Sequence, residues 1–251
     1  MISLNKLTTN GKALFLAYDQ GLELGPDNLR DKAIDPEFVL QIAIKGGYNA
    51  IVLQKGLAEK YQKLQEKIPL ILKLNGKTEL SRGDPISRQI CSVKEAVLLG
   101  AEAVGYTIYP GSQHESVMIA EFGKIVEQAH KKGIPAILWS YPKGKNITNE
   151  TSPENVCYAA RIGLELGADI VKIKYCGSKQ CFEKAVKAAG AIKVMMAGGP
   201  EIKEQEFLKR VKNVIAAGAI GVVVGRNVWL NKNPLKITER IKRIVFTNNS
   251  S

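Results

Sequence analysis

The stretch Gly167-Ala-Asp-Ile-Val-Lys-Ile-Lys-Tyr-Cys-Gly177 carries the clearest signs of both fold and chemistry in this chain of 251 residues. Ile170, Val171 and Ile173 are β-branched and the run is bounded by glycines, so its middle predicts a short buried β-strand. The preceding helical pattern, residues 153–166, stops directly before the first glycine, as a helix does when it leads into a strand. This helix–glycine–strand order is typical of an α/β fold.

The same stretch contains two lysines. Because successive side chains of a strand alternate between its faces, Lys172 and Lys174 point the same way, roughly 7 Å apart. Desolvation and like-charge repulsion both lower the pKa of a buried lysine, which supplies the neutral amine that a Schiff-base nucleophile needs. Alternatively, both lysines are structural and reach an acidic partner or solvent at the strand end. The stretch by itself does not choose between these interpretations.

Eight short apolar runs of β type recur along the chain, with helical patterns between them. The predicted strands are residues 13–18, 50–53, 70–74, 103–107, 136–139, 170–174, 193–197 and 221–225. The predicted helices are residues 36–45, 93–99, 117–132, 153–166, 179–189 and 201–217. Eight strand–helix units in about 250 residues predict one (β/α)8 TIM barrel over residues 1–251, with a loose tail at 247–251. The active site of such a barrel lies at the carboxyl ends of its strands.

Composition limits the class of protein. The net charge of +12 indicates an anionic partner, and its spread over nearly every helix favours small phosphates over a nucleic-acid-binding face. No apolar run is long enough for a membrane span and no signal peptide is visible, so we expect a cytoplasmic protein without a membrane partner. The four cysteines form no CxxC pair, and we expect reduced, mostly buried thiols.

Candidate side chains follow the first and fifth predicted strands. Asp19 stands at the end of the first, where a carboxylate can handle protons or bind hydroxyls, although ordinary turn chemistry also explains it. Trp139 and Tyr141 end the fifth and share a face by the period of two. An indole and a phenol therefore lean toward the predicted barrel mouth together, unless Trp139 serves only core packing.

Glycine-rich turns follow the seventh and eighth strands, at Gly198-Gly199 and Gly225-Arg226. Such turns leave backbone N–H groups free to face an anion, and barrels commonly bind a phosphate between these two loops. Arg226 adds a planar donor suited to bidentate contacts with phosphate. We therefore predict a phosphate site here.

Other chemistries find little support. With only two histidines, His114 and His130, a multi-histidine metal site or a serine–histidine triad is not indicated, and a helix dipole explains His130. Asn75-Gly-Lys-Thr78 is no P-loop, because Ile71 occupies the position of the required glycine. We expect neither a metal nor a cofactor.

Five segments, in this order and spacing, resemble the archaeal-type class I fructose-bisphosphate aldolases of the DeoC-like group. They are residues 18–21, 139–144, 169–175, 197–199 and 225–227. This family also includes 2-amino-3,7-dideoxy-D-threo-hept-6-ulosonate synthase and autoinducer-2 phosphate thiolase. The resemblance covers nearly the whole chain and implies a metal-independent carbon–carbon lyase acting on a phosphorylated sugar. It also implies a homo-oligomer, because the family forms rings and decamers.

The resemblance assigns roles that strand parity alone cannot. Lys172 corresponds to the Schiff-base lysine, Tyr141 to the general acid/base and Trp139 to the ring that positions this tyrosine. Asp19 corresponds to the carboxylate near the substrate hydroxyls. The residues assigned to substrate and phosphate binding are Gly198, Gly199, Gly225, Arg226 and Lys174.

One position departs from the family pattern. Members commonly read Asp-His/Gln-Gly-x-Glu-His-Gly-Pro in the first loop, whereas this chain has Leu24 in place of the second histidine. The expected reaction is cleavage of fructose 1,6-bisphosphate to dihydroxyacetone phosphate and glyceraldehyde 3-phosphate. A transaldolase-like synthase that joins the same enamine to another acceptor is the alternative within the family. A barrel that binds phosphate or RNA without chemistry is the alternative outside it.

Overall fold

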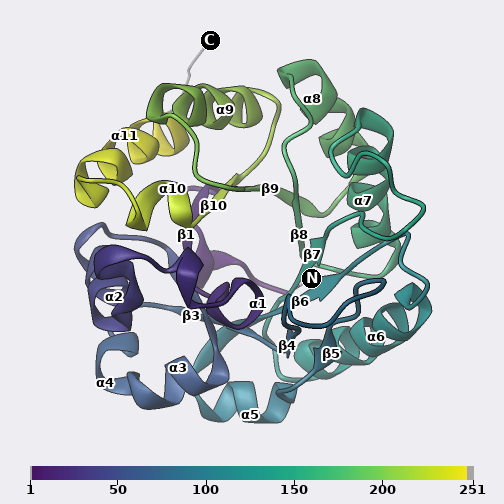
Figure 1. Cartoon of the computed structure of the whole chain (residues 1–251), viewed down its shortest axis with the longest axis horizontal. Coiled ribbons are helices and arrows are strands. Elements are labelled where there is room, and N and C mark those ends of the chain that lie inside the picture. The colour runs from purple at the N-terminus through teal and green to yellow at the C-terminus, as the bar shows by residue number, and fades with distance from the viewer. Residues whose placement is uncertain (1, 248–251) are drawn as a thin grey trace.

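A computed structural model describes residues 2–247, and its centre is a closed barrel of eight parallel strands (Figure 1). The strands are β1 (Ala13–Ala17), β2 (Ala50–Gln54), β3 (Leu70–Lys73), β6 (Ala101–Ile108), β7 (Ala136–Ser140), β8 (Ile170–Ile173), β9 (Lys193–Ala197) and β10 (Gly221–Val224). They follow one another around the barrel in chain order, and β10 pairs with β1 to close it. The predicted TIM barrel is confirmed, and each predicted strand lies within two residues of its observed ends.

Helices surround the barrel (Figure 1). They are α2 (Pro36–Lys45), α3 (Lys55–Lys60), α4 (Gln62–Gln65), α5 (Val93–Leu98), α6 (Glu115–Lys131), α7 (Pro153–Glu165), α8 (Lys179–Ala188), α9 (Glu204–Ala216) and α11 (Pro234–Phe246). Shorter helical turns are α1 (Gly21–Leu24) and α10 (Arg226–Trp229), and β4 (Asn75–Gly76) pairs with β5 (Arg88–Gln89). The six predicted helices are all present, whereas α3, α4 and α11 were not predicted.

Helix α9 begins later than the pattern indicated, at Glu204 instead of Glu201. The intervening residues belong to the loop after β9, because the backbone N–H of Ile202 donates to the side-chain oxygen of Asn227 at 3.0 Å. A side chain from α10 therefore satisfies the backbone donor of Ile202 in the loop before α9.

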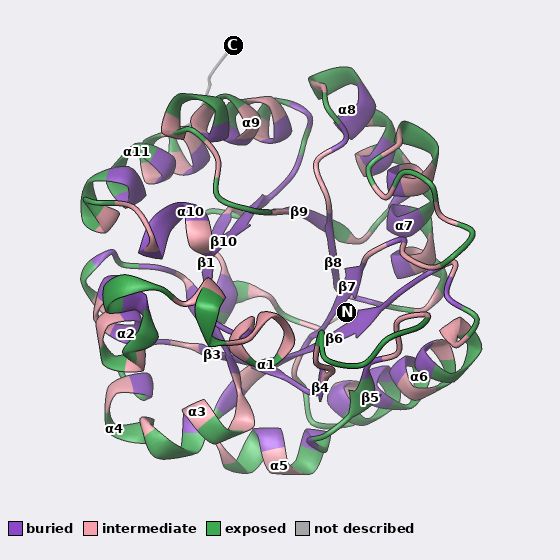
Figure 2. Cartoon of the chain, viewed as in Figure 1, coloured by how far each residue is buried: buried purple, intermediate pink, exposed green. Residues whose placement is uncertain are grey.

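Two apolar layers hold the fold together, and Figure 2 shows the buried strands inside a ring of half-exposed helices. The inner layer fills the barrel with side chains such as Phe15, Ile71 and Ile137, and Leu7 packs into the same cluster from the N-terminal segment. The outer layer joins the opposite face of each strand to the helices. Because both faces of every strand are covered, the strands read as continuous apolar runs, which is why they were visible in the sequence.

Glycines end several helices as expected. Gly100, Gly133, Gly167 and Gly218 follow α5, α6, α7 and α9, and each has a positive φ between 73° and 98°. Only glycine enters this region without steric cost, so the chain can reverse there and begin the next strand.

The cysteine prediction was wrong for two of the four residues. Cys176 and Cys181 form a disulfide directly after β8, whereas Cys91 and Cys157 are free. Ser178 caps α8 by accepting a hydrogen bond from the backbone N–H of Cys181 at 3.1 Å. This tight turn brings the two Cα atoms to 6.1 Å, within the range that a disulfide spans.

Of the expected tail, residues 248–251 lie outside the described part of the chain, and Thr247 caps the end of α11. Among residues 2–247, no helix combines the length and apolar character that crossing a bilayer requires.

Candidate active site

A cavity of about 360 Å³ opens at the carboxyl ends of the strands. All nine predicted site residues line it: Asp19, Trp139, Tyr141, Lys172, Lys174, Gly198, Gly199, Gly225 and Arg226. Parallel strands that close into a barrel bring their carboxyl ends to one rim, so residues scattered over 200 positions meet there. Within the described chain, no three His, Cys, Asp or Glu side chains converge on a possible metal position.

Lys172 projects from β8 into the bottom of this cavity, and only 5% of the residue is exposed. Burial lowers the pKa of its amine from 10.5 to about 8, an effect that the negative charge of Asp19 opposes and the positive charge of Lys73 reinforces. The amine has no ion-pair partner among residues 2–247. A fraction of Lys172 is therefore neutral, and nucleophilic, near neutral pH.

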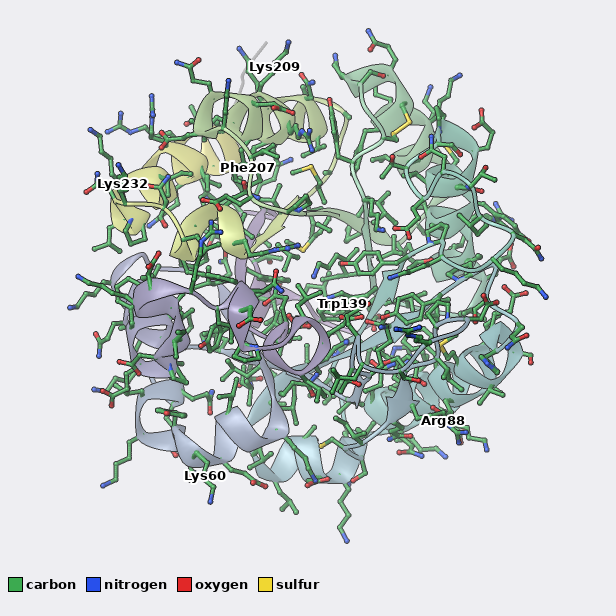
Figure 3. The ribbon with its side chains drawn as sticks, viewed as in Figure 1. Lys60, Arg88, Trp139, Phe207, Lys209 and Lys232 are labelled. Atoms are coloured by element: carbon green, nitrogen blue, oxygen red, sulfur yellow. A yellow bond between two sulfur atoms is a disulfide. The ribbon has the colours of Figure 1, made fainter. Side chains whose placement is uncertain are left out.

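Trp139 forms a wall beside this amine. It pairs with Lys172 across the register of β7 and β8, and the lysine nitrogen lies 4.8 Å from the indole centroid. The six-membered part of the ring packs against Gly105 of β6, where an added Cβ atom would come within 2.1 Å of it. Figure 3 shows Trp139 near the centre of the ring of strands. Its buried indole N–H has no hydrogen-bond partner within residues 2–247.

Tyr141 is the second aromatic residue near this amine, with its ring centroid 5.9 Å from the Lys172 nitrogen. Burial, together with the negative charges of Asp19 and Glu23, raises the pKa of its phenol well above 10. Tyr141 is therefore a neutral phenol that can donate a proton.

Several residues in the cavity wall were not predicted from the sequence, among them Glu23, Tyr109 and Lys73. Glu23 accepts a hydrogen bond from the hydroxyl of Tyr109, and both line the cavity. Lys73, at the end of β3, is 4% exposed and lies 5.7 Å from the centroid of Trp139. A lysine inside an apolar strand was the signal that drew attention to Lys172, and the same signal marked Lys73.

Lys174 has an acidic partner. It lies one residue beyond β8 and forms an ion pair with Glu150, although it shares the cavity with Lys172 as parity required. The like charge that acts on Lys172 therefore comes from Lys73 and not from Lys174. The ion pair with Glu150 is the contact that the structural alternative expected, and the role of Lys174 in phosphate binding stays a prediction.

The two glycine turns lie side by side on the rim. A Cβ atom on Gly198 would be crowded, because it would lie 3.2 Å from the carbonyl oxygen of Val223, and Gly199 has a φ of +71°. A Cβ atom on Gly225 would lie 2.9 Å from the amide nitrogen of Gln20. These glycines keep backbone close to the cavity, where peptide N–H groups can face an anion.

Side chains behind the rim hold these turns in place. The amide of buried Asn227 donates to the carbonyl oxygens of Gly198 and Pro200, each at 2.9 Å. The indole N–H of Trp229 donates to the carbonyl oxygen of Ala17 at 3.1 Å. This bond connects the end of β1 to α10, the helical turn that follows Gly225. The loops are thus braced before any ligand binds.

Arg226 places a positive charge beside the two glycine turns. Burial lowers the pKa of its guanidinium, while Glu201 acts in the opposite direction. Glu201 is paired with Arg30, so in the described chain Arg226 has no ion-pair partner of its own. A half-buried, unpaired guanidinium beside two open glycine turns suits a phosphate group.

Comparison with known proteins agrees with this geometry. The family model of the DeoC/LacD family aldolases matches residues 13–231. A class 1 fructose-bisphosphate aldolase of Thermoproteus tenax is 51% identical over 94% of this chain and 90% of its own length. A fructose-bisphosphate aldolase/6-deoxy-5-ketofructose 1-phosphate synthase of Methanocaldococcus jannaschii is 38% identical over 94% of this chain and 81% of its own.

Among solved structures, a Schiff-base-forming fructose-1,6-bisphosphate aldolase superimposes with a TM-score of 0.94 and 49% identity. The match covers 97% of this chain and 98% of that one. A family match over most of the chain, at this level of identity, agrees with the barrel and the buried lysine described above. The chain belongs to the DeoC/LacD family of aldolases.

Proposed function

We propose that the protein is a class I fructose-bisphosphate aldolase that uses Lys172 as its Schiff-base nucleophile. The observation that carries this proposal is the buried amine of Lys172, with its pKa lowered to about 8, in the same cavity as two glycine turns and Arg226. A neutral amine attacks a carbonyl, and the turns hold the phosphate of the carbonyl compound. The relatives' names supply the substrate, fructose 1,6-bisphosphate.

The reaction begins when the Lys172 nitrogen attacks carbon 2 of the ketose, and loss of water gives an iminium ion. Tyr141 gives its proton to the departing hydroxyl of the carbinolamine, and the positive iminium nearby favours the resulting phenolate. This phenolate then accepts the proton of the 4-hydroxyl. The bond between carbons 3 and 4 then breaks, its electrons neutralise the iminium as an enamine, and glyceraldehyde 3-phosphate leaves. Protonation of carbon 3 and hydrolysis release dihydroxyacetone phosphate and free Lys172.

The substrate's two phosphates need two anion-binding regions. The 1-phosphate belongs at Gly198, Gly199, Gly225 and Arg226. We assign the 6-phosphate to Lys174, together with Lys143 and Arg210, which line the same cavity. Asp19, buried near Lys172, is then placed to bind the hydroxyls between them.

A second candidate is a synthase that transfers the same enamine to another acceptor. The relative from Methanocaldococcus jannaschii carries an aldolase and a synthase name together, and Leu24 presents an apolar side chain to the cavity where the family commonly has a histidine. Cleavage of fructose 1,6-bisphosphate and condensation with an aspartate-semialdehyde-type acceptor, assayed side by side, separate the two reactions.

We further propose that residues 1–251 form one catalytic domain that works in the cytoplasm as a homo-oligomer, with a decamer as the form implied by the family. Leu80, Leu98 and Tyr158 support assembly, since they are 91%, 77% and 67% exposed and apolar side chains favour burial against another subunit. Light scattering after gel filtration gives the subunit number.

The surface lysines named in Figure 3, such as Lys60 and Lys209, lie far apart on the periphery of the molecule. We therefore expect that the protein is not retained on RNA at physiological salt.

The decisive experiment is borohydride reduction in the presence of dihydroxyacetone phosphate, followed by peptide mass mapping. We expect one stable adduct, on Lys172, and none in the Lys172→Met variant. Lys174→Met serves as the matched control, because this second lysine lines the same cavity but is paired with Glu150. An adduct on Lys174 or Lys73, or no adduct, would contradict the proposal.

A further inference from the structure

The disulfide between Cys176 and Cys181 closes the loop that leads from β8, the strand of Lys172, into α8. Both cysteines are buried. They are five positions apart, and Gly177 between them has a φ of +93°, so the backbone can turn sharply there. The mechanism above uses neither the disulfide nor the residue before it, Tyr175, although Tyr175 lines the substrate cavity.

Tyr175 connects the end of β8 to two helices. Its hydroxyl accepts a hydrogen bond of 2.8 Å from the side-chain amide of Asn213, in α9. Its ring stacks on that of Phe182, in α8, with the centroids 6.5 Å apart and an angle of 29° between the planes. Phe182 is fully buried and directly follows Cys181, so the disulfide and the stacked rings hold the same turn of the chain.

The guanidinium of Arg210 lies over the ring of Tyr175. Its central carbon is 5.4 Å from the ring centroid, which is within the range of a cation–π contact. Arg210 and Asn213 are three residues apart in α9 and lie on one face of this helix, so Tyr175 contacts both of them. Arg210 also pairs with Glu206, one helical turn before it. The aromatic ring thus helps to fix the direction of a cation that lines the substrate cavity.

We propose that Tyr175 and the Cys176–Cys181 disulfide are positioning residues that hold Arg210 where it binds the 6-phosphate of the substrate. This inference rests on the proposed function, which assigns that phosphate to Arg210 and two lysines. The affinity for a bisphosphate then depends on the oxidation state of the disulfide.

Reduction of the disulfide releases this arrangement. A dithiol transfers two electrons and two protons to the sulfur–sulfur bond, which breaks into two thiols, while the dithiol itself becomes a cyclic disulfide. The loop that carries Tyr175 loses its covalent link to α8, because Cys181 belongs to that helix. Arg210 then keeps its partner Glu206 but loses a fixed contact with the ring.

The test compares fructose 1,6-bisphosphate with fructose 1-phosphate, because only the first carries the 6-phosphate. Treatment with dithiothreitol, and the double variant Cys176→Ser/Cys181→Ser, should each raise KM for the bisphosphate about 3- to 10-fold, a part of what a charge-assisted hydrogen bond contributes. Neither should change kcat or the KM for fructose 1-phosphate. Arg210→Met should raise KM for the bisphosphate further and should no longer respond to dithiothreitol.

Two substitutions separate the ring of Tyr175 from its hydroxyl. Tyr175→Leu should match the double serine variant, whereas Tyr175→Phe keeps the ring beside Arg210 and should stay within about twofold of the wild type. Cys157→Ser is the matched control, because Cys157 is a free cysteine and its loss should change neither KM. Alkylation and mass measurement count the thiols before and after reduction, and circular dichroism shows that each variant is folded.

Equal KM values for the bisphosphate in the oxidised protein, the reduced protein and the double serine variant would overturn the inference. A KM that rises equally for both substrates would overturn it as well, since the loop would then support the cavity without regard to the 6-phosphate. The same holds for an unchanged KM in Arg210→Met, or for four free thiols after treatment with a thiol oxidant. Failure of borohydride to trap dihydroxyacetone phosphate on Lys172 refutes the proposed function, whereas trapping together with any of these results refutes this inference alone.

Discussion

Replacing Lys172 by Met should abolish aldolase activity and yet make the folded protein more stable at pH 7. The amine is 5% exposed, and burial lowers its pKa in the folded chain to about 8 from 10.5 in the unfolded chain. Met has a similar length, carries no charge and suits the apolar surroundings of Trp139, so the substitution removes the cost of burying a cation without leaving a large cavity.

The size and sign of the effect follow from proton linkage. Between pH 8 and 10.5 the unfolded chain binds more protons at this lysine than the folded chain, so the wild type gains stability as the pH rises through that window. Below pH 8 the lysine is protonated in both states, and the whole difference, about 3 kcal/mol, counts against the folded state. Lys172→Met should therefore raise the free energy of unfolding by about 3 kcal/mol at pH 7 and by less than about 1 kcal/mol at pH 10.

Urea unfolding of wild type and variant at pH 7 and pH 10 measures both values. Lys209→Met is the matched control, because Lys209 is an exposed lysine on α9 whose removal should leave the free energy of unfolding within about 0.5 kcal/mol at either pH. A variant no more stable than the wild type at pH 7, or a gain that stays constant with pH, would refute the claim that burial of an ammonium lowers the pKa of Lys172.

Three further results are expected. Tyr141→Phe should lower turnover by about 10²- to 10³-fold while borohydride still traps dihydroxyacetone phosphate on Lys172, because the phenol acts after the amine; loss of trapping would contradict this order. Arg226→Met should raise KM for fructose 1,6-bisphosphate by about 10- to 100-fold, as expected for a lost charge-assisted hydrogen bond, and should leave the affinity for an unphosphorylated ketose unchanged. Reduction of the Cys176–Cys181 disulfide should lower the free energy of unfolding by about 2 kcal/mol, measured with and without dithiothreitol, and the reductant should have no such effect on a Cys176→Ser variant.

The barrel could be predicted from the sequence because its evidence is local. Each strand is covered on both faces, so runs such as 221–224 are continuously apolar, and a glycine with positive φ marks the end of the preceding helix. The members of the site could be predicted for a related reason. Once parallel strands close into a barrel, every carboxyl end reaches the same rim, and Asp19, Tyr141 and Arg226 must meet there.

Contacts between distant segments were beyond the sequence. The ion pair of Lys174 with Glu150, the bond from His130 to Asp169 at 2.9 Å and the bracing of the glycine turns by Asn227 each join separate loops or elements. The disulfide was missed for another reason. The spacing of Cys176 and Cys181 matches no common disulfide or metal-binding motif, and the two residues come close only when the turn before α8 has folded.

What the sequence by itself determined is therefore the order of strands and helices, the single barrel and the set of residues at its rim, because alternation and glycine boundaries act between neighbours in the chain. Only the tertiary structure decided which lysine is a nucleophile and which is a paired cation. Lys172, Lys174 and Lys73 have the same side chain, and the difference between them comes from desolvation and from the charges that lie within a few ångströms. Those distances are set when β3, β7 and β8 close around Trp139, and no local pattern encodes them.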